Sequence, residues 1–520
     1  MIPALLLAAS VHLIQVDATA DRHPINPLIY GGSFTTGGKL PGGGVTLNRW
    51  GGNATTRYNW LENASNRASD WYFESITELG ATPSAGPDLF IDLTQYGKAE
   101  PMITIPTLGY VAKLTLGREN LASFSVAKYG PQRGRDPFWA DAGDGMHFDG
   151  SPVTNDPNDA NIPVDAGYQQ GWIEHLAGKG VHYLALDNEP SLWHVTHRDV
   201  HPAGATMDEV ASKSIEMARR IKSVDQKLLV AGPEEWGWPG YFYSGYDQQW
   251  GAAHNWSSFP DRAAHGGQEY LPWLLDQFRR AETTYGRRLL DVFTVHYYPQ
   301  GGEFSNDVSQ AMQLRRNRST RSLWDPNYHD ESWIDGKVML IPRLKQWVAQ
   351  YYPGTRVGIT EYNWGAESHI NGATTQADIL GIFGREGLDL AARWTTPTPD
   401  TPTWRAIQIY GDFGDVSVRA TAPSPDELSA FAAVRTSDGK LTLMIVNKGF
   451  SASTANVALA NFIAAGPAEA WQLTSENRIA RIDDVVVSGA SLSTDVPAQS
   501  ITLLVIPQAP QPARRRAARH

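Results

Sequence analysis

The stretch Leu184–His194, LALDNEPSLWH, sets polar side chains at the end of an apolar segment. Short apolar runs of this kind are typical of buried parallel strands. Asp187, Asn188 and Glu189 follow the run directly, and Pro190 cannot continue a strand. Neighbouring residues of a regular strand point to opposite faces, so Asn188 and Glu189 can face one site only if the strand ends or kinks there. Glu189 is then a candidate proton donor, and Asn188 a hydrogen-bonding partner for a substrate. We interpret Asp187 as a structural hydrogen-bond acceptor.

Similar apolar runs recur along the chain, with helical or loop segments between them. Thr206 and Glu209 form a capping box that predicts one of the helices, directly after the strand that carries Glu189. Eight such runs favour a (β/α)8 barrel over an open sheet. The predicted strands are Leu28–Phe34, Thr46–Trp50, Met102–Thr107, Tyr183–Leu186, Leu228–Ala231, Val292–Tyr298, Val357–Thr360 and Leu388–Trp394.

The character of the sequence changes after about residue 415. Short alternating runs with an Asp-Gly turn then predict a β-sandwich. We therefore expect a catalytic barrel over residues 25–414 and a sandwich over 415–508, which also takes an N-terminal strand from 11–24. The basic stretch 509–520 is predicted to be a disordered tail.

Composition excludes several classes of function. The 520 residues carry a net charge of -11, which argues against a nucleic-acid partner, and no apolar run is long enough to span a membrane. Cysteine is absent, so thiolate metal sites and cysteine nucleophiles are excluded. The apolar start lacks the basic residues of a normal signal peptide, yet we expect a secreted, monomeric protein. The 18 Trp and 20 Tyr suit stacking against sugar rings.

Active sites of α/β barrels lie at the carboxyl ends of the strands, and two glutamates close such strands. Glu189 and Glu361 stand three strands apart, which places them across the barrel mouth. Each glutamate alone could be a salt-bridged structural residue. Together with aromatics at most other strand ends, they suit glycoside hydrolysis, which needs one carboxylic acid and one carboxylate.

The segments NRWGGNATTRYNW, LDNEPSLWHVTHRDVHP, VHYYP and ITEYNWG resemble glycoside hydrolase family 44. The similarity runs from about residue 11 to 508. The resemblance implies a barrel with a β-sandwich, and endo-acting, retaining cleavage of β-1,4-glucans, including xyloglucan. It also implies Glu189 as the acid/base and Glu361 as the nucleophile, with no cofactor for catalysis.

The other strand ends supply candidate substrate-binding residues. Arg49 either orients Glu361 or pairs with a structural acid, and a neighbouring cation keeps a nucleophile ionised. Tyr298 is expected to donate a hydrogen bond to the nucleophile, with Tyr297 as the alternative. Some of the candidate tryptophans will be core residues, the usual fate of large aromatics. The candidates are Asn48, Arg49, Trp50, Trp60, Asn188, Trp193, Glu234, Trp236, His296, Tyr297, Tyr298, Trp324, Trp364 and Trp394.

A loop dense in Asp and Asn, residues 140–165, offers hard oxygen ligands. Because members of the resembling family hold structural calcium, the loop is a candidate calcium site. The alternative is a set of Asx turns. The candidate ligands are Asp141, Asp144, Asp149, Asp156 and Asp159.

Two rival functions remain open at this stage. One is a mannanase or xylanase that uses the same machinery on another β-1,4-glycan. The other is a catalytically silent glycan-binding protein, which would have lost a carboxylate, whereas both are present here. A long segment, Gln300–Gly336, follows the sixth strand, and loops of that length are usually functional.

Overall fold

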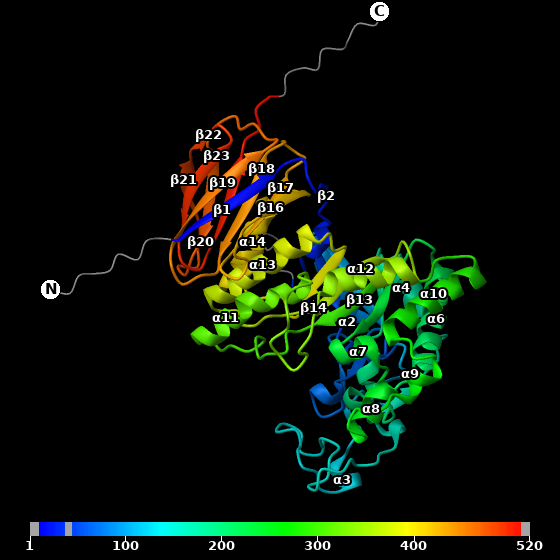
Figure 1. The fold of residues 1–520 in the computed structure, drawn as a ribbon. Coiled ribbons are helices and arrows are strands. Elements are labelled where there is room, and N and C mark those ends of the chain that lie inside the picture. The colour runs from blue at the N-terminus through cyan, green and yellow to red at the C-terminus, as the bar shows by residue number, and fades with distance from the viewer. Residues whose placement is uncertain (1–9, 37–43, 511–520) are drawn as a thin grey trace, which may run out of the picture.

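The computed structural model describes residues 10–36 and 44–510, which form a barrel and a β-sandwich (Figure 1). Eight parallel strands close the barrel, as the sequence predicts. In order around the ring they are β3 (Gly31–Ser33), β4 (Leu47–Trp50), β7 (Glu100–Ile105), β11 (Tyr183–Leu186), β12 (Leu229–Glu235), β13 (Val292–Tyr297), β14 (Arg356–Tyr362) and β15 (Leu390–Arg393).

Every predicted barrel strand overlaps an observed strand, but some ends differ. Leu28 belongs to a 3-10 helix, η1 (Pro27–Ile29), which Asn26 caps and Pro27 starts. In the other direction, β12 and β14 run past their predicted ends and include Glu234, Glu235 and Glu361. The prediction stopped at the first polar residues, whereas these acids are buried and continue their strands.

Helices cover the outside of the barrel. In α6 (Met207–Val224), the Thr206 hydroxyl accepts a hydrogen bond from the backbone N–H of Glu209 at 3.1 Å, as the capping box predicts. The other long helices are α2 (Ala85–Tyr96), α4 (Gln170–Gly178), α10 (Tyr270–Tyr285), α12 (Leu340–Tyr351) and α13 (Ile370–Arg385).

The predicted loop Gln300–Gly336 contains α11 (Gln310–Ser319) and a 3-10 helix, η5 (Thr320–Leu323). The sequence of α11, QAMQLRRNRS, is polar and lacks the apolar period of a core-facing helix. The sequence signal for this helix is therefore its start, where Ser309 caps the first turn.

Alternation along the strands aims side chains into the barrel. On β11, Tyr183 and Ala185 belong to the small cluster inside the barrel, whereas Leu184 and Leu186 belong to the large core shared with the helices. Beyond β11 this alternation ends, because Asp187 and Glu189 have positive φ angles at the mouth of the barrel.

The sandwich uses strands from both ends of the chain. The N-terminal strand β1 (Ser10–Asp17) pairs antiparallel with β16 (Val416–Thr421) and parallel with β19 (Ser453–Ala460). One layer contains β16 with β17 (Leu428–Val434), β18 (Leu441–Asn447), β24 (Ser500–Ile506), β20 (Ala468–Leu473) and β21 (Ile479–Val485); the other contains β19, β23 (Ser491–Val496) and β22 (Val487–Ser488).

Helix α13 lies between the barrel and the sandwich (Figure 1). A side chain at Gly381 of this helix would meet the ring of Phe431 at 2.1 Å, so glycine allows the two parts to approach closely. In the described part of the chain, no helix combines the length and apolarity of a membrane span. Most of the predicted basic tail, residues 511–520, lies outside the described residues.

Candidate active site

The turn after β11 presents Glu189 through an unusual backbone. Asp187 and Glu189 both have positive φ angles, 61° and 48°, so the strand kinks at this point as the sequence requires. Pro190 starts the 3-10 helix η4 (Pro190–Leu192) directly afterwards. The backbone N–H of Glu189 donates to the carbonyl of Glu234 at 3.0 Å. Left-handed residues other than glycine cost about 1–3 kcal/mol, and the surrounding contacts must hold this turn in place.

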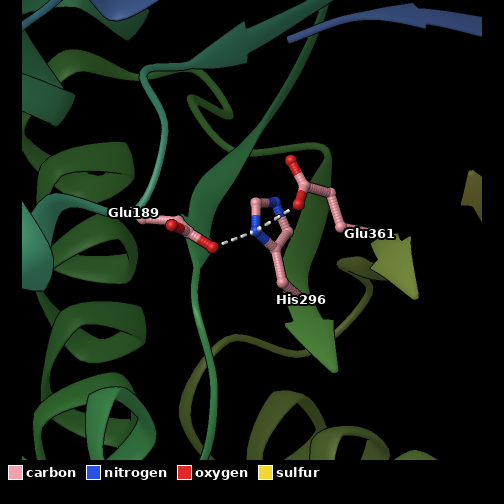
Figure 2. Close-up of side chains that lie close together, drawn as sticks. All are labelled: Glu189, His296 and Glu361. Atoms are coloured by element: carbon pink, nitrogen blue, oxygen red, sulfur yellow. Dashed lines mark hydrogen bonds and ion pairs between the residues drawn. The ribbon is translucent and has the colours of Figure 1, made fainter. Parts of the chain in front are cut away.

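Glu189 and Glu361 meet around the imidazole of His296 (Figure 2). The His296 Nδ1 lies 2.8 Å from Glu189 Oε1 and 3.5 Å from Glu361 Oε2. One carboxylate oxygen of each glutamate and this nitrogen all lie within 4.8 Å of one another. Carboxyl groups about 5–5.5 Å apart are typical of retaining glycosidases, whereas inverting enzymes leave about 6.5–9.5 Å.

Glu361 is held by a cation and a phenol. Arg49 Nη1 donates to Glu361 Oε1 at 2.7 Å, and the Tyr298 hydroxyl donates to Oε2 at 2.8 Å. Arg49 is fully buried and also pairs with Glu234 at 3.0 Å, so both alternatives for this residue hold at once. Tyr297, the alternative to Tyr298, is buried and packs against Trp364.

The pKa values of Glu189, His296 and Glu234 are shifted in different directions. Burial raises the pKa of Glu189, against the effect of its hydrogen bond from His296. Burial opposes protonation of His296, yet Glu361 and Glu189 raise its pKa to about 9, so the imidazole is a cation at neutral pH. For Glu234, burial is outweighed by Arg49 and His296, and the pKa falls to about 2. Glu189 therefore favours the protonated form beside an ionised Glu234.

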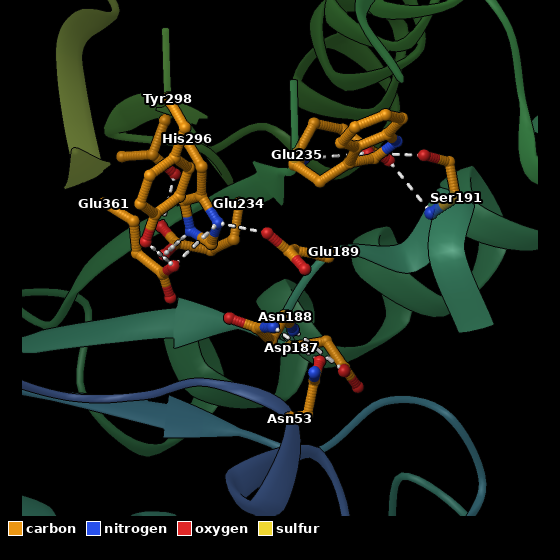
Figure 3. Close-up of polar contacts among 12 residues, drawn as sticks. Asn53, Asp187, Asn188, Glu189, Ser191, Glu234, Glu235, His296, Tyr298 and Glu361 are labelled. Atoms are coloured by element: carbon orange, nitrogen blue, oxygen red, sulfur yellow. Dashed lines mark hydrogen bonds and ion pairs between the residues drawn. The ribbon is translucent and has the colours of Figure 1, made fainter. Parts of the chain in front are cut away.

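Two further carboxylates support the Glu189 turn (Figure 3). Glu235 accepts hydrogen bonds from the Ser191 hydroxyl at 2.7 Å and the Tyr270 hydroxyl at 3.0 Å. Burial raises the pKa of Glu235 to about 7, although these donors act in the opposite direction. Asp187 is buried and accepts from the Thr56 hydroxyl at 2.7 Å, which agrees with its structural interpretation. Glu235 was absent from the predicted site; the Glu-Glu pair at a strand end is the signal that could have found it.

The two asparagines among the candidates have different surroundings. Asn188 accepts from Arg49 Nη2 at 2.9 Å and donates to Asn53 at 3.1 Å, next to the catalytic candidates. Asn48 is fully buried; it accepts from the backbone of Thr35 and donates to Thr35 and Thr94. Both amide protons of Asn48 are used, so the prediction that it binds substrate is wrong for this conformation.

The predicted tryptophans separate by burial. Trp193 is fully buried, and Trp364 and Trp50 are 3% and 8% exposed, so none of them offers a free face to a sugar. These three are core residues, and the prediction of sugar platforms is wrong for them. Trp324 is half-buried under the Arg385 guanidinium in the groove between barrel and sandwich, away from the catalytic candidates.

Three candidates keep partly exposed rings. Trp394 follows β15. A Cβ atom at Gly52 would lie 2.6 Å from the Trp394 ring, so this ring lies beside the segment that begins with Asn53. Trp236 follows Glu235 at the end of β12, and the indole of Trp60 donates to the Tyr168 carbonyl at 3.1 Å. More exposed aromatics were missed: Trp71 at 41%, Trp333 at 57% and Phe138 at 87%.

The five predicted calcium ligands do not come together. Within the described residues, the group of acidic and imidazole ligands close enough to share an ion is Glu189, His296 and Glu361. The aspartates instead serve local structure, as in the Asx-turn alternative. Asp144, Asp149 and Asp156 accept from the backbone two residues on, Asp141 binds the start of α3 (Val126–Tyr129), and Asp159 pairs with Lys128.

Another pair of carboxyl groups, Glu74 and Asp136, is buried outside the barrel ring. Glu74 and Asp136 are 5% and 4% exposed, and among residues 10–36 and 44–510 nothing donates a hydrogen bond to Glu74 Oε1. Burial, and then the adjacent Asp136 carboxyl group, raise the pKa of Glu74 to about 8. Arg67 opposes this shift more weakly, and it pairs with Glu78 at 3.0 Å. A divalent cation with oxygen ligands would compensate two such neighbouring carboxylates.

Comparisons with known proteins agree with this geometry. Residues 64–301 match the model of glycoside hydrolase family 44. The crystal structure of CelM2, a bifunctional glucanase-xylanase from a metagenome library, is 59% identical with a TM-score of 0.95, over 96% of this chain and 99% of that one. A Paenibacillus polymyxa xyloglucanase of family 44 is 28% identical, with a TM-score of 0.79 over 96% of this chain and all of that one.

A curated relative, Endoglucanase A of Paenibacillus lautus, is 31% identical over 85% of the chain. The chain spans 64% of the length of that relative and 34% of the length of a second one. The match to CelM2 covers almost all of both chains, including the barrel whose mouth holds the two glutamates in this protein. The chain belongs to glycoside hydrolase family 44.

Proposed function

We propose that this protein is a retaining, endo-acting hydrolase of β-1,4-glucans that uses Glu189 as acid/base and Glu361 as nucleophile. The observation that carries the proposal is the approach of the two carboxylates within 4.8 Å, with cations beside them. The spacing suits direct attack by one carboxylate while the other transfers a proton.

In the first step, a Glu361 oxygen attacks the anomeric carbon and the bond to the leaving sugar breaks. The leaving oxygen takes the proton of Glu189, so no alkoxide is released. Burial favours the protonated form of Glu189 that this step requires. Arg49 donates to one oxygen of the Glu361 carboxylate and Tyr298 to the other, so the two donors fix its orientation.

In the second step, Glu189 takes a proton from water, and the water oxygen attacks the anomeric carbon. The bond to Glu361 breaks, and both glutamates return to their starting states. His296 lies 2.8 Å from Glu189, and in the resting enzyme Glu361 and Glu189 raise its pKa to about 9, so it carries a positive charge beside the two carboxyl groups. Asn188, fixed by Arg49 and Asn53, is placed to hydrogen-bond the sugar hydroxyl next to the reacting carbon.

The substrate is proposed to be a neutral glucan of the cellulose or xyloglucan type. Exposed aromatics and amide groups near the site suit neutral sugars, and the names of the similar glucanases support the same class. Xylan is the second candidate, because CelM2 is described as a bifunctional glucanase-xylanase. Polymers of this size remain outside cells, so we propose that the enzyme is extracellular. We also propose that it is a monomer.

The experiment is a substrate panel with a stereochemical readout. Reducing sugars should be released from carboxymethyl cellulose, lichenan or xyloglucan, with less from xylan and mannan. Proton NMR of an early time point should show the β-anomer first, because two displacements at one carbon retain its configuration. An α-anomer that appears first would mean inversion and would overturn the roles of both glutamates.

We further propose that the fold holds a structural calcium ion at Glu74 and Asp136, in place of the five aspartates expected from the sequence. The support is the burial of both carboxyl groups and a Glu74 Oε1 that receives no hydrogen bond from the described residues, with Arg67 acting on Glu74 more weakly than Asp136. Calcium would act on stability there, not on the reacting bond.

A further inference from the structure

An aromatic surface lies outside the residues assigned so far. The rings of Trp71 and Phe138 are stacked, with an interplanar angle of 21° and centroids 6.3 Å apart. Trp71 is 41% exposed and Phe138 is 87% exposed, so each ring keeps a face or edge open to solvent. Neighbouring Tyr72 packs edge-on against Trp71 at 5.5 Å. Exposed aromatic groups of this kind mark binding surfaces more often than they serve folding.

A short polar chain connects this surface to the catalytic residues. Asn188 donates to Asn53 at 3.1 Å, and Asn53 donates to Asp70 at 3.0 Å. Figure 3 shows Asn53 beside Asn188 at the start of this chain. The charge of Glu361 adds to the burial that raises the pKa of Asp70, which shows that Asp70 lies near the nucleophile. Trp71 is the next residue, so the aromatic surface begins just beyond the polar groups of the site.

Both rings stand on fixed turns. The backbone N–H of Glu74 donates to the Trp71 carbonyl, and that of Phe73 donates to Ala68 at 2.8 Å. On the other side, the Phe138 N–H donates to Asp136 Oδ1 at 3.0 Å. Behind the surface, Phe73 packs against Phe124 at 5.0 Å. A surface that is already rigid loses little conformational freedom when a ligand binds.

We propose that Trp71 and Phe138 form a platform that binds the glucan chain at sugar units beyond those that are cleaved. The proposal rests on the proposed function, since the occupant is the same β-1,4-glucan. The apolar faces of its sugar rings match the exposed aromatic rings, and the polymer reaches them because Asn53 and Asp70 join the platform to the site. A short substrate that ends at the reacting bond would not reach the platform.

The test compares Trp71→Ala and Phe138→Ala with a matched control, Trp256→Ala. Trp256 is 47% exposed and packs near Tyr243 and Phe259 on a different segment. We expect kcat/KM on polymeric β-glucan to fall about 10-fold in each platform variant, the loss of one aromatic contact. On an aryl cellobioside, the same variants should stay within about twofold of the parent. The control should keep both activities.

Binding is measured separately in the Glu361→Ala background by affinity electrophoresis in gels that contain β-glucan. The parent should be retarded, and the platform variants should lose most of the retardation. Equal retardation of all variants, or an equal loss of activity on polymer and aryl cellobioside, would overturn the platform. If the Glu361→Ala protein is retarded through Trp71 and Phe138, but the protein with Glu361 intact releases no sugar, the proposed function is overturned and the platform stands. If the first does not bind the polymer and the second does not cleave it, both proposals are overturned.

Discussion

Two pairs of buried carboxyl groups, one at the mouth of the barrel and one at the short strand β6 (Glu74–Thr77) outside the barrel ring, differ in what stands beside them. Glu189 and Glu361 share His296, and Arg49 contacts Glu361 directly at 2.7 Å. Glu74 and Asp136 are also buried, but no described residue donates a hydrogen bond to Glu74 Oε1, and burial raises the pKa of Glu74 to about 8. Burying charges without partners costs several kcal/mol per ion. The first pair therefore carries its own cations for chemistry, whereas the second needs a proton or an added cation.

The catalytic pair is also asymmetric. Glu361 lies within strand β14, at a register shift between Ile359 and Tyr362, and is held by Arg49 and Tyr298. Glu189 lies on a left-handed turn, and the adjoining residue Ser191 is held by Glu235. The same residue type thus becomes a fixed carboxylate at one strand end and a proton carrier at the other.

The largest effect is expected at Glu361. Glu361→Ala should lower kcat by at least about 10⁴-fold on every substrate, because no covalent intermediate can form. Azide should restore some turnover and give the α-glycosyl azide, since it attacks from the face that the carboxylate vacated. Comparable activity of this variant on any glucan would contradict the assignment. Circular dichroism controls for folding.

Glu189→Ala should give a loss that depends on the leaving group. Natural glucans need a proton on the leaving oxygen and should lose about 10²–10⁴-fold. Aryl glycosides with very acidic phenols need none and should still form the intermediate in a pre-steady-state burst. Azide should rescue this variant as the β-glycosyl azide. The same substrate dependence and rescue product as in Glu361→Ala would mean that the two glutamates do not have separate roles.

A smaller effect is expected when Glu235, which holds the turn that carries Glu189, is replaced. The charge of Glu189 adds to the burial that raises the pKa of Glu235. Because repulsion between two carboxylates is mutual, Glu235→Gln should move the alkaline limb of kcat/KM to lower pH and cost roughly 10-fold. Tyr241, Tyr270 and Ser191 also face this carboxyl group. Tyr270→Phe, which keeps the charge, should leave the limb nearer its original pH. An unchanged pH profile in Glu235→Gln would reduce Glu235 to a packing role.

The smallest effect concerns Glu74 and Asp136. A chelator should lower the melting temperature by roughly 2–5 °C, because a ligand of the folded state stabilises it. The raised pKa of Glu74 means that the metal-free folded state loses stability as pH rises from the ordinary carboxyl range towards about 8. The chelator effect should therefore be larger at pH 8 than at pH 6. Glu74→Gln should remove it, whereas a chelator-insensitive parent would favour a shared proton.

Much of the barrel could be predicted because its strands are short apolar runs that end in functional groups. Glu189 and Glu361 stood out for that reason, and their contacts with His296 and Arg49 follow from the closure of the ring. Tryptophan positions could not be ranked, since burial depends on packing that no local pattern records. Trp193 lies three positions after Pro190 and is fully buried, whereas Trp71 lies in a polar segment and is exposed.

The prediction of the calcium ligands was wrong for a related reason. A run of aspartates predicts oxygen ligands, but three of these side chains bind their own backbone two residues on. Glu74 and Asp136 are 62 positions apart in the sequence and come together only through the fold.

The most direct test of the two-glutamate account is to trap the intermediate. A 2-deoxy-2-fluoro cellobioside with a dinitrophenol leaving group should glycosylate the enzyme and turn over slowly, because fluorine destabilises both transition states. Mass spectrometry of a protease digest should place one fluorocellobiosyl group on the peptide that contains Glu361, and Glu189→Ala should still be labelled. A label on Glu189, or no label while the β-anomer still appears first, would contradict the account.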